Sequence, residues 1–225
     1  MPLPLVIWAV SAAVGAIVGA RAVATAQRNT YRLAVLGMGM SGKTTLINSL
    51  RGEWVDGDPG RTNAPLVYEK VKLTANGRQL IFKRLVDVSG QQSAWPVWED
   101  RVNESRHVLY LLKATHLLAP AEHRPAVAAQ AWHRIEDDAG QIRLWLDEGR
   151  ASLCVLVVTH RDLDPRFADL GEDAYEHLVC DQLDPIVMKL GGDRRVRIVT
   201  GSLVDPDAAA AVTDKIMQHI AAEER

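Results

Sequence analysis

One short segment constrains the fold more than any other part of the chain. Residues Gly37–Thr44 read Gly-Met-Gly-Met-Ser-Gly-Lys-Thr, which follows the pattern G-x-x-x-x-G-K-[ST]. An apolar run precedes it at 31–36, and a helical pattern follows it at 43–51. In such a strand–loop–helix unit, backbone N–H groups converge on a polyphosphate, and glycines keep side chains out of their way. The sequence therefore predicts a phosphate-binding loop at the start of an α/β domain.

The residues of this loop have distinct expected roles. Lys43 adds a positive charge for the β- and γ-phosphates, and Thr44 offers its hydroxyl to Mg²⁺. The N-terminus of the following helix contributes its dipole. The residues predicted to surround the phosphates are Gly37, Met38, Gly39, Met40, Ser41, Gly42, Lys43 and Thr44.

Strand and helix patterns alternate after the loop. Strands are predicted near 31–36, 66–74, 79–86, 107–113, 153–159 and 195–200, and helices near 43–51, 93–104, 122–148, 168–190 and 206–223. Asn76-Gly77 is a two-residue hairpin signal, so the second and third strands should be antiparallel. The other strands alternate with helices, which predicts a three-layer α/β domain whose mainly parallel, six-stranded sheet is covered on both faces.

The N-terminal segment has a different composition. Leu3–Ala20 contains no charged side chain, and about 20 such residues span a bilayer as a helix. A buried core helix and a cleaved signal peptide, with Ala22-Val23-Ala24 as its cleavage site, are the alternatives. We expect a transmembrane anchor at 1–24, a polar linker at 25–30 and a nucleotide-binding domain at 31–225.

Charges after this segment predict its orientation. Arg21, Arg28 and Arg32 follow it, and no acidic residue occurs before Glu53, so the domain should lie on the cytoplasmic face of a single-pass membrane protein. Ser11, Gly15 and Gly19 are four residues apart, which would let two spans approach closely and dimerise. The alternative is that small residues are simply common in membrane helices.

Overall charge and cysteine content exclude other classes of protein. The 225 residues carry a net charge of −2, which argues against a nucleic-acid binder, because such proteins normally present a basic surface. Cys154 and Cys180 form neither a disulfide framework nor a zinc spacing. We expect both to be small buried side chains in a reducing compartment.

Polar residues follow the ends of two later strands. In "DVSGQ", Asp87 can hold a metal ion through water, the Gly90 N–H can reach a γ-phosphate, and Gln91 can orient an attacking water. Asp162 follows another buried strand, and its carboxylate could accept hydrogen bonds from N1 and N2 of guanine. Adenine has no matching pair of donors, so such a site would discriminate strongly between the two bases.

Taken together, these segments resemble a known family. "GMGMSGKTT", "DVSGQ", "THRD" and "TGS" occur in the order and at the strand ends typical of the Ras superfamily of small GTPases. Thr44-Thr45, Val88 and Trp98 resemble the Arf branch of that superfamily. With its N-terminal apolar segment, the chain is also similar to the β subunit of the signal recognition particle receptor. The resemblance covers roughly residues 31–223.

The resemblance implies further site residues. Thr62 resembles the switch threonine that closes on Mg²⁺ and the γ-phosphate, although a threonine in a polar turn is the alternative. Gln91 and Lys43 would be catalytic, and Thr44, Thr62 and Asp87 would hold the metal. The further nucleotide-binding residues would be Thr45, Gly90, Thr159, His160, Asp162, Thr200, Gly201 and Ser202. His160 departs from the family, which has a lysine there, and the Gly201 N–H would bind guanine O6.

These observations predict a membrane-anchored small GTPase that binds GTP or GDP with Mg²⁺. It would hydrolyse GTP slowly and act as a switch, with an activating or exchange partner and a protein effector. One alternative is a GTP-loaded receptor or assembly module in which binding matters and turnover does not. A P-loop ATPase is another, and Asp162 would then not face the base.

Overall fold

The computed structural model describes residues 30–55, 66–75, 78–117, 126–149 and 151–224. The chain divides into two units, Met1–Thr30 and Tyr31–Arg225. The predicted anchor, the linker up to residue 29, the Gly15/Gly19 contact, Thr62 and Asn76-Gly77 lie outside the described residues. Within the described ranges, no helix combines the length and the apolar character needed to cross a bilayer.

A single mixed sheet organises the domain. Its strands are β1 (Thr30–Tyr31), β2 (Leu33–Gly37), β3 (Leu66–Ala75), β4 (Arg78–Asp87), β5 (His107–Lys113), β6 (Leu153–Thr159) and β7 (Val196–Thr200). They lie in the order β1-β4-β2-β5-β6-β7, and β3 pairs with β4. β2 is parallel to β4 and β5, β6 is parallel to β5 and β7, and β3 is antiparallel to β4. The predicted mainly parallel sheet is confirmed, and the two-residue β1 adds to it.

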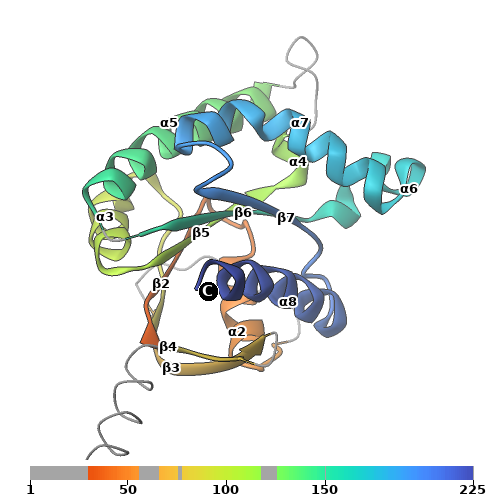
Figure 1. The fold of residues 1–225 in the computed structure, drawn as a ribbon. Helices are drawn as coiled ribbons and strands as arrows, with labels where there is room; N and C mark the ends of the chain where they lie inside the picture. The colour runs from red at the N-terminus through yellow and green to blue at the C-terminus, as the bar shows by residue number, and fades with distance from the viewer. Residues whose placement is uncertain (1–29, 56–65, 76–77, 118–125, 150, 225) are drawn as a thin grey trace, which may run out of the picture. The chain divides into compact units, whose positions relative to one another are not determined.

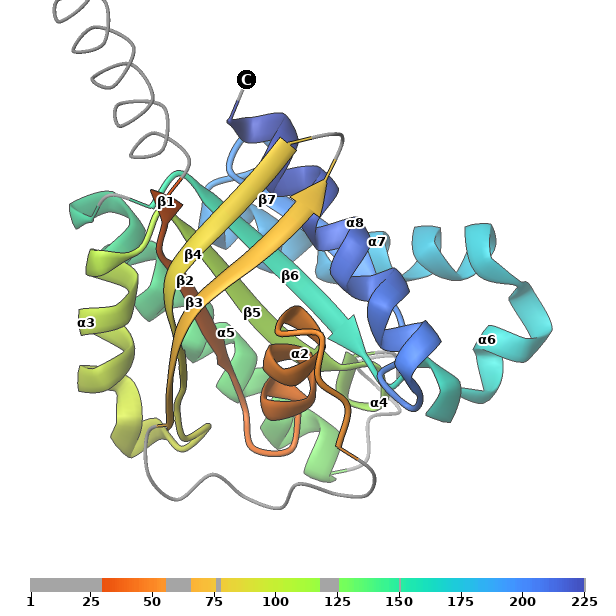
Figure 2. The same ribbon diagram turned by 90° about the horizontal axis from the view of Figure 1, so that it is seen from below.

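Helices cover both faces of the sheet (Figure 1). They are α2 (Lys43–Leu50), α3 (Trp95–Glu104), α4 (Ala114–Leu117), α5 (Ala126–Glu148), α6 (Pro165–Leu170), α7 (Glu172–Leu190) and α8 (Pro206–Glu223), with short 3-10 turns at Gln92–Ala94 and Arg161–Leu163. Figure 2 shows α2 and α8 on the same side of the sheet, whereas α3, α5 and α7 lie on the other. The described part of the chain therefore has the three layers that the strand–helix alternation predicts.

The prediction of a single helix at 168–190 is wrong in its first part. Pro165–Leu170 and Glu172–Leu190 are separate helices, because Gly171 between them has φ 73° and ψ 175°, which ends the first. α6 begins earlier than predicted because the Asp164 carboxylate accepts a hydrogen bond from the Arg166 N–H at 3.0 Å. The four-residue α4 was not predicted, because a single turn leaves no periodic signal.

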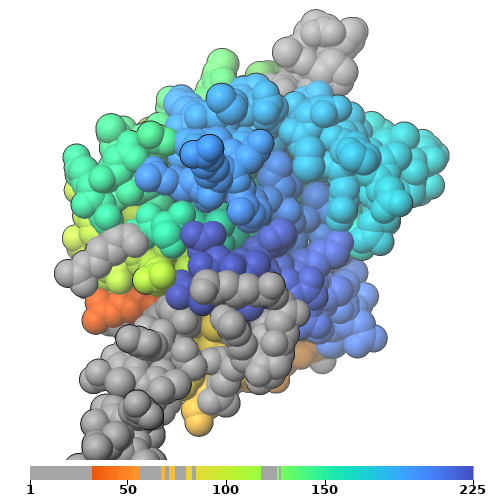
Figure 3. All heavy atoms as spheres, viewed as in Figure 1, coloured from red at the N-terminus to blue at the C-terminus, as the bar shows by residue number. Residues whose placement is uncertain are grey.

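Alternate residues of each central strand enter two different cores. Leu36, Tyr110 and Leu156 pack under α3, α5 and α7, whereas Val35 and Val155 pack under α2 and α8. Because both faces are covered, these strands are apolar throughout and show no polar alternation. In the space-filling view, atoms of α5, α7 and α8 form much of the visible face (Figure 3).

The two cysteines differ in exposure. Cys154 of β6 is buried, as expected, but Cys180 is exposed on α7. The expectation for Cys180 is therefore wrong, since its position lies on the outer face of that helix.

The order of the strands changes direction at β2. β2 lies between β4 and β5, so the chain passes to one side of β2 before it crosses to the other. In open parallel sheets, the helices that start such connections diverge at this point, and the carboxyl ends of the strands face a gap. The carboxyl ends of β2, β4 and β6 are Gly37, Asp87 and Thr159. The topology thus brings three of the predicted site residues to one edge.

Truncating a central core residue tests the two-sided packing. We expect Leu156→Ala to lower the free energy of unfolding by about 2–5 kcal/mol, because Leu156 is fully buried and the cavity is walled by three helices. Leu144→Ala is the control, since Leu144 is 54% exposed, and it should change stability by less than about 0.5 kcal/mol. Equal effects in denaturant unfolding would contradict the described core.

Candidate functional site

The backbone of the loop at 37–42 has a shape that only glycine permits at two points. Gly37 has φ 142°, and a Cβ there would meet the Leu111 carbonyl oxygen at 2.5 Å. Gly42 has φ 87°, and a Cβ there would meet Leu203 Cδ1 at 2.7 Å. Met40 also has a positive φ of 58°. The loop therefore turns tightly between β2 and α2, with little room for side chains at either end.

Lys43 folds back over this loop. Its Nζ donates hydrogen bonds to the carbonyl oxygens of Gly37 at 2.9 Å and Met38 at 2.8 Å. Burial lowers the pKa of Lys43 to about 8, and the nearby Asp87 carboxylate only partly opposes that shift. A partly desolvated ammonium group thus stands at the N-terminus of α2, where an anion would gain most from it.

Thr44 and Asp87 place two side-chain oxygens, both possible metal ligands, beside the lysine. The Thr44 hydroxyl donates to Asp87 Oδ2 at 2.5 Å, and the Asp87 side chain is buried at the end of β4. Mg²⁺ prefers oxygen ligands and usually keeps several waters, so one hydroxyl and one carboxylate beside a phosphate site suit it. The residues present therefore fit a magnesium ion that completes its shell with phosphate oxygens and water.

The turn after β4 packs directly on the loop. A Cβ built on Gly90 would overlap the Gly39 nitrogen and the Met38 carbonyl carbon, and it would lie 2.7 Å from the Gly37 oxygen. The next residue, Gln91, is exposed, and its Oε1 accepts a hydrogen bond from the Ser93 hydroxyl at 3.4 Å. The structure thus places the Gly90–Gln91 turn against the loop that Lys43 also contacts.

The end of β6 is joined to the loop through Thr159. Its hydroxyl lies 3.0 Å from the carbonyl oxygens of both Ser41 and Leu112, so it can donate to either. His160 adopts a left-handed conformation with φ 59°, and its Nδ1 lies 2.8 Å from the Thr159 hydroxyl oxygen. Burial and the Lys113 charge lower the pKa of His160, which favours a neutral ring. Thr159 therefore connects the end of β6 to the loop backbone, and the His160 imidazole lies beside the loop.

The predicted base-contacting residues lie together, but their bonds differ from those expected. The Ser202 hydroxyl donates to the Asp162 carboxylate, whose side chain is otherwise exposed. The Gly201 N–H donates to the Val158 carbonyl at 2.9 Å, and the Thr200 hydroxyl donates to Glu176 at 3.1 Å. The expected Gly201 donor is thus already used within the sheet. Within the described part of the chain, the Ser202 and Leu203 N–H groups have no such partner.

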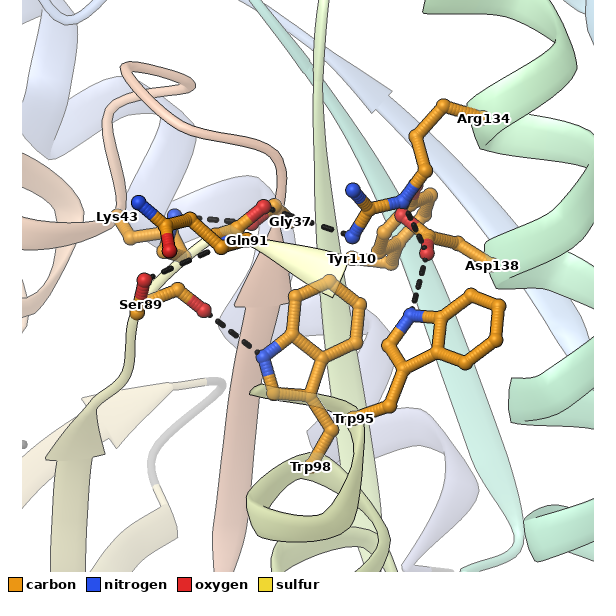
Figure 4. Close-up of polar contacts among 10 residues, drawn as sticks. Gly37, Lys43, Ser89, Gln91, Trp95, Trp98, Tyr110, Arg134 and Asp138 are labelled. Carbon is orange, nitrogen blue, oxygen red and sulfur yellow. Dashed lines mark hydrogen bonds and ion pairs between the residues drawn. The ribbon is translucent and has the colours of Figure 1, made fainter. Parts of the chain in front are cut away.

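A buried acidic residue near the site was missed by the sequence reasoning. Asp138 of α5 accepts hydrogen bonds from Trp95 Nε1 at 2.7 Å, Arg134 Nε at 2.7 Å and the Tyr110 hydroxyl at 2.8 Å (Figure 4). Burial outweighs these bonds and raises the pKa of Asp138. Its sequence signal is its position three residues after Ile135, within the apolar stripe of the predicted helix.

Two glycines of the site allow a matched test of this packing. We expect Gly90→Ala to lower the free energy of unfolding by about 1–3 kcal/mol, because the methyl group would overlap the loop backbone. Gly39→Ala should change it by less than about 0.5 kcal/mol, since nothing lies within 4 Å of the added Cβ. Denaturant unfolding measures the free energy of unfolding of both variants. An unchanged value for Gly90→Ala would contradict the described contact.

The lowered pKa of Lys43 predicts a pH dependence for anion binding. A bound polyphosphate would hold Lys43 protonated, so above about pH 8 binding must take up a proton. Affinity should be level below that pH and fall by up to about tenfold per pH unit above it. Titration calorimetry with GTP and Mg²⁺ at a series of pH values measures this affinity. Lys43→Arg stays charged throughout and should flatten the profile; an equally steep fall in that variant would exclude Lys43 as its source.

Comparison with known proteins gives a partial result. A family model, Arf: ADP-ribosylation factor family, matches residues 20–124. That range contains the loop at 37–42, Asp87 and the Gly90–Gln91 turn, and it ends before Thr159. No curated protein matches the chain. Over these residues the chain is similar to the Arf family, and the match supports an Arf-like GTPase of the Ras superfamily.

Proposed function

We propose that the domain is a small GTPase that binds GTP or GDP with Mg²⁺ and changes conformation when GTP is hydrolysed. The observation that carries this proposal is the meeting of the tight loop, Lys43 and the Thr44–Asp87 pair at the carboxyl edge of a parallel sheet. The similarity to the Arf family over residues 20–124 supports it.

The phosphates would lie along the loop at the N-terminus of α2. Loop N–H groups and Lys43 would bind the β- and γ-phosphates and stabilise negative charge in the transition state. Thr44 and Asp87 would hold Mg²⁺, together with Thr62. Held there, Mg²⁺ would supply positive charge that offsets the negative charge of the phosphates.

The Gly90–Gln91 turn would sense the γ-phosphate. Gly90 lies against the loop, and its N–H would bind that phosphate. Gln91 would orient the attacking water, but its side chain is exposed and has only a long bond to Ser93. A glutamine held so weakly predicts slow hydrolysis, which an activating partner would accelerate by ordering it.

The base would bind beyond the carboxyl ends of β6 and β7, where Asp162 and Ser202 lie. Asp162, oriented by Ser202, would accept from guanine N1 and N2, and the neutral ring of His160 would stack on the base. Because the Gly201 N–H is bonded to Val158, we assign the donor to guanine O6 to the following N–H groups, at Ser202 or Leu203.

Attachment to a membrane remains part of the proposal. The uncharged segment at 3–20 would anchor the chain, and the arginines after it would keep the domain on the cytoplasmic face. Pairing through Gly15 and Gly19 and a role like that of the signal recognition particle receptor β subunit are further predictions. In the receptor-like alternative, bound GTP matters and turnover does not, which the weakly held Gln91 favours.

Exchange of the base-reading carboxylate tests the nucleotide. We expect Asp162→Asn to weaken GTP binding by at least about 100-fold and to favour XTP, because the amide can donate where the carboxylate accepted. Asp169→Asn is the control, since Asp169 is exposed on α6, and it should keep the GTP preference. An unchanged GTP preference in Asp162→Asn, or equal binding of ATP by the natural chain, would contradict the assignment.

A further inference from the structure

Arg134 is enclosed at the edge of the proposed phosphate site. Its side chain is only 16% exposed, and its Nε donates to the fully buried Asp138 at 2.7 Å. The guanidinium carbon lies 5.8 Å from the ring centroid of Trp95 and 5.9 Å from that of Trp98. An acidic residue and two aromatic faces therefore fix the position of this cation.

The free end of the guanidinium points toward the turn after β4. Arg134 Nη2 lies 3.5 Å from the Gly90 carbonyl oxygen, at the long limit of a hydrogen bond (Figure 4). The positive charge of Arg134 also contributes to the lowered pKa of Lys43, so the two cations lie near each other. Helix α5 thus brings a second positive charge to a site that the loop motif alone does not include.

The turn that contains Gln91 is held from both sides. Trp98 Nε1 donates to the Ser89 carbonyl oxygen at 3.0 Å, and Trp95 Nε1 donates to Asp138. Arg134 contacts the carbonyl of Gly90, which lies between these two anchors. That carbonyl belongs to the planar peptide unit that includes Gln91 N and Gln91 Cα, so its orientation fixes the direction of the Gln91 N–H and the place of the Gln91 Cα.

A purely structural role would not require a guanidinium. A buried ion pair such as Arg134–Asp138 adds little stability, because the cost of desolvation offsets much of its attraction. Two apolar side chains of similar volume on α5 would pack against α3 equally well. What an apolar pair could not do is donate to Asp138 and, with another N–H of the same planar group, reach Gly90.

We infer that Arg134 is a positioning residue: held by Asp138, it donates to the Gly90 carbonyl and orients the Gly90–Gln91 turn for GTP hydrolysis. This inference rests on the proposed function. The 3.5 Å contact should shorten when nucleotide is bound, since hydrogen bonds that serve catalysis are often long in the free protein. A misplacement of about 1 Å in such a group can cost about 100-fold in rate.

Single-turnover hydrolysis in the full chain separates positioning from stability. The variants are Arg134→Gln, Arg134→Lys and, as the control, Arg143→Gln, which removes an arginine from an i,i+4 pair with Asp147 on the same helix. The dissociation constant for GTP with Mg²⁺, the hydrolysis rate of bound GTP and the melting temperature are measured for each. We expect Arg134→Gln to slow hydrolysis by roughly 10- to 100-fold with GTP affinity within about threefold of the natural chain.

If Arg134→Gln does not fold, Arg134→Lys separates a positioning role of Arg134 from a role in stability. Lysine keeps the charge beside Asp138 but has no planar fork, so it should restore the melting temperature and leave hydrolysis slow. Arg143→Gln should hydrolyse GTP at the natural rate. Hydrolysis within about twofold of the natural rate in a folded Arg134 variant would overturn the inference, as would a natural chain that binds GTP without hydrolysing it. Absence of magnesium-dependent GTP binding by the natural chain would instead overturn the proposed function.

Discussion

Close approach of three backbone segments is the constraint on which the site depends. The loop between β2 and α2, the turn at Gly90 and the end of β5 meet with no space for a Cβ at Gly37 or Gly90. The packed core on both faces of the sheet holds these segments in place, because each one belongs to a buried strand or follows one. The polar chemistry of the edge is therefore set by apolar packing several residues away.

Side chains then connect the parts of this edge in pairs. Thr159 links the end of β6 to the loop through the Ser41 carbonyl, and Ser202 links the end of β7 to Asp162. Lys43 donates hydrogen bonds to two carbonyl oxygens of its own loop. Such links mean that a ligand on one part of the edge would affect the order of the others, which suits a protein that must distinguish two nucleotide states.

Much of the fold could be predicted from the sequence because its signals are local. The apolar strands, the glycine-rich loop and the helix starts depend on neighbouring residues, and the strands at 107–113 and 153–159 appear with the predicted bounds. The break at Gly171 was missed because a glycine within a long periodic pattern can continue a helix, and only its dihedral angles show that it does not. Long-range bonds were hardest to predict: the backbone bond from Gly201 to Val158 and the bonds from Trp95 and Tyr110 to Asp138 join segments far apart in the chain. No single sequence window contains both partners.

The two tryptophans beside the Gly90–Gln91 turn have an optical consequence. Trp95 and Trp98 each donate an indole N–H within this region, and Arg134 lies over both rings. Indole emission depends on hydrogen bonding and on nearby charge, so any rearrangement of the turn would alter the fluorescence of the unlabelled protein. The segment that would change with the bound nucleotide therefore carries its own chromophores.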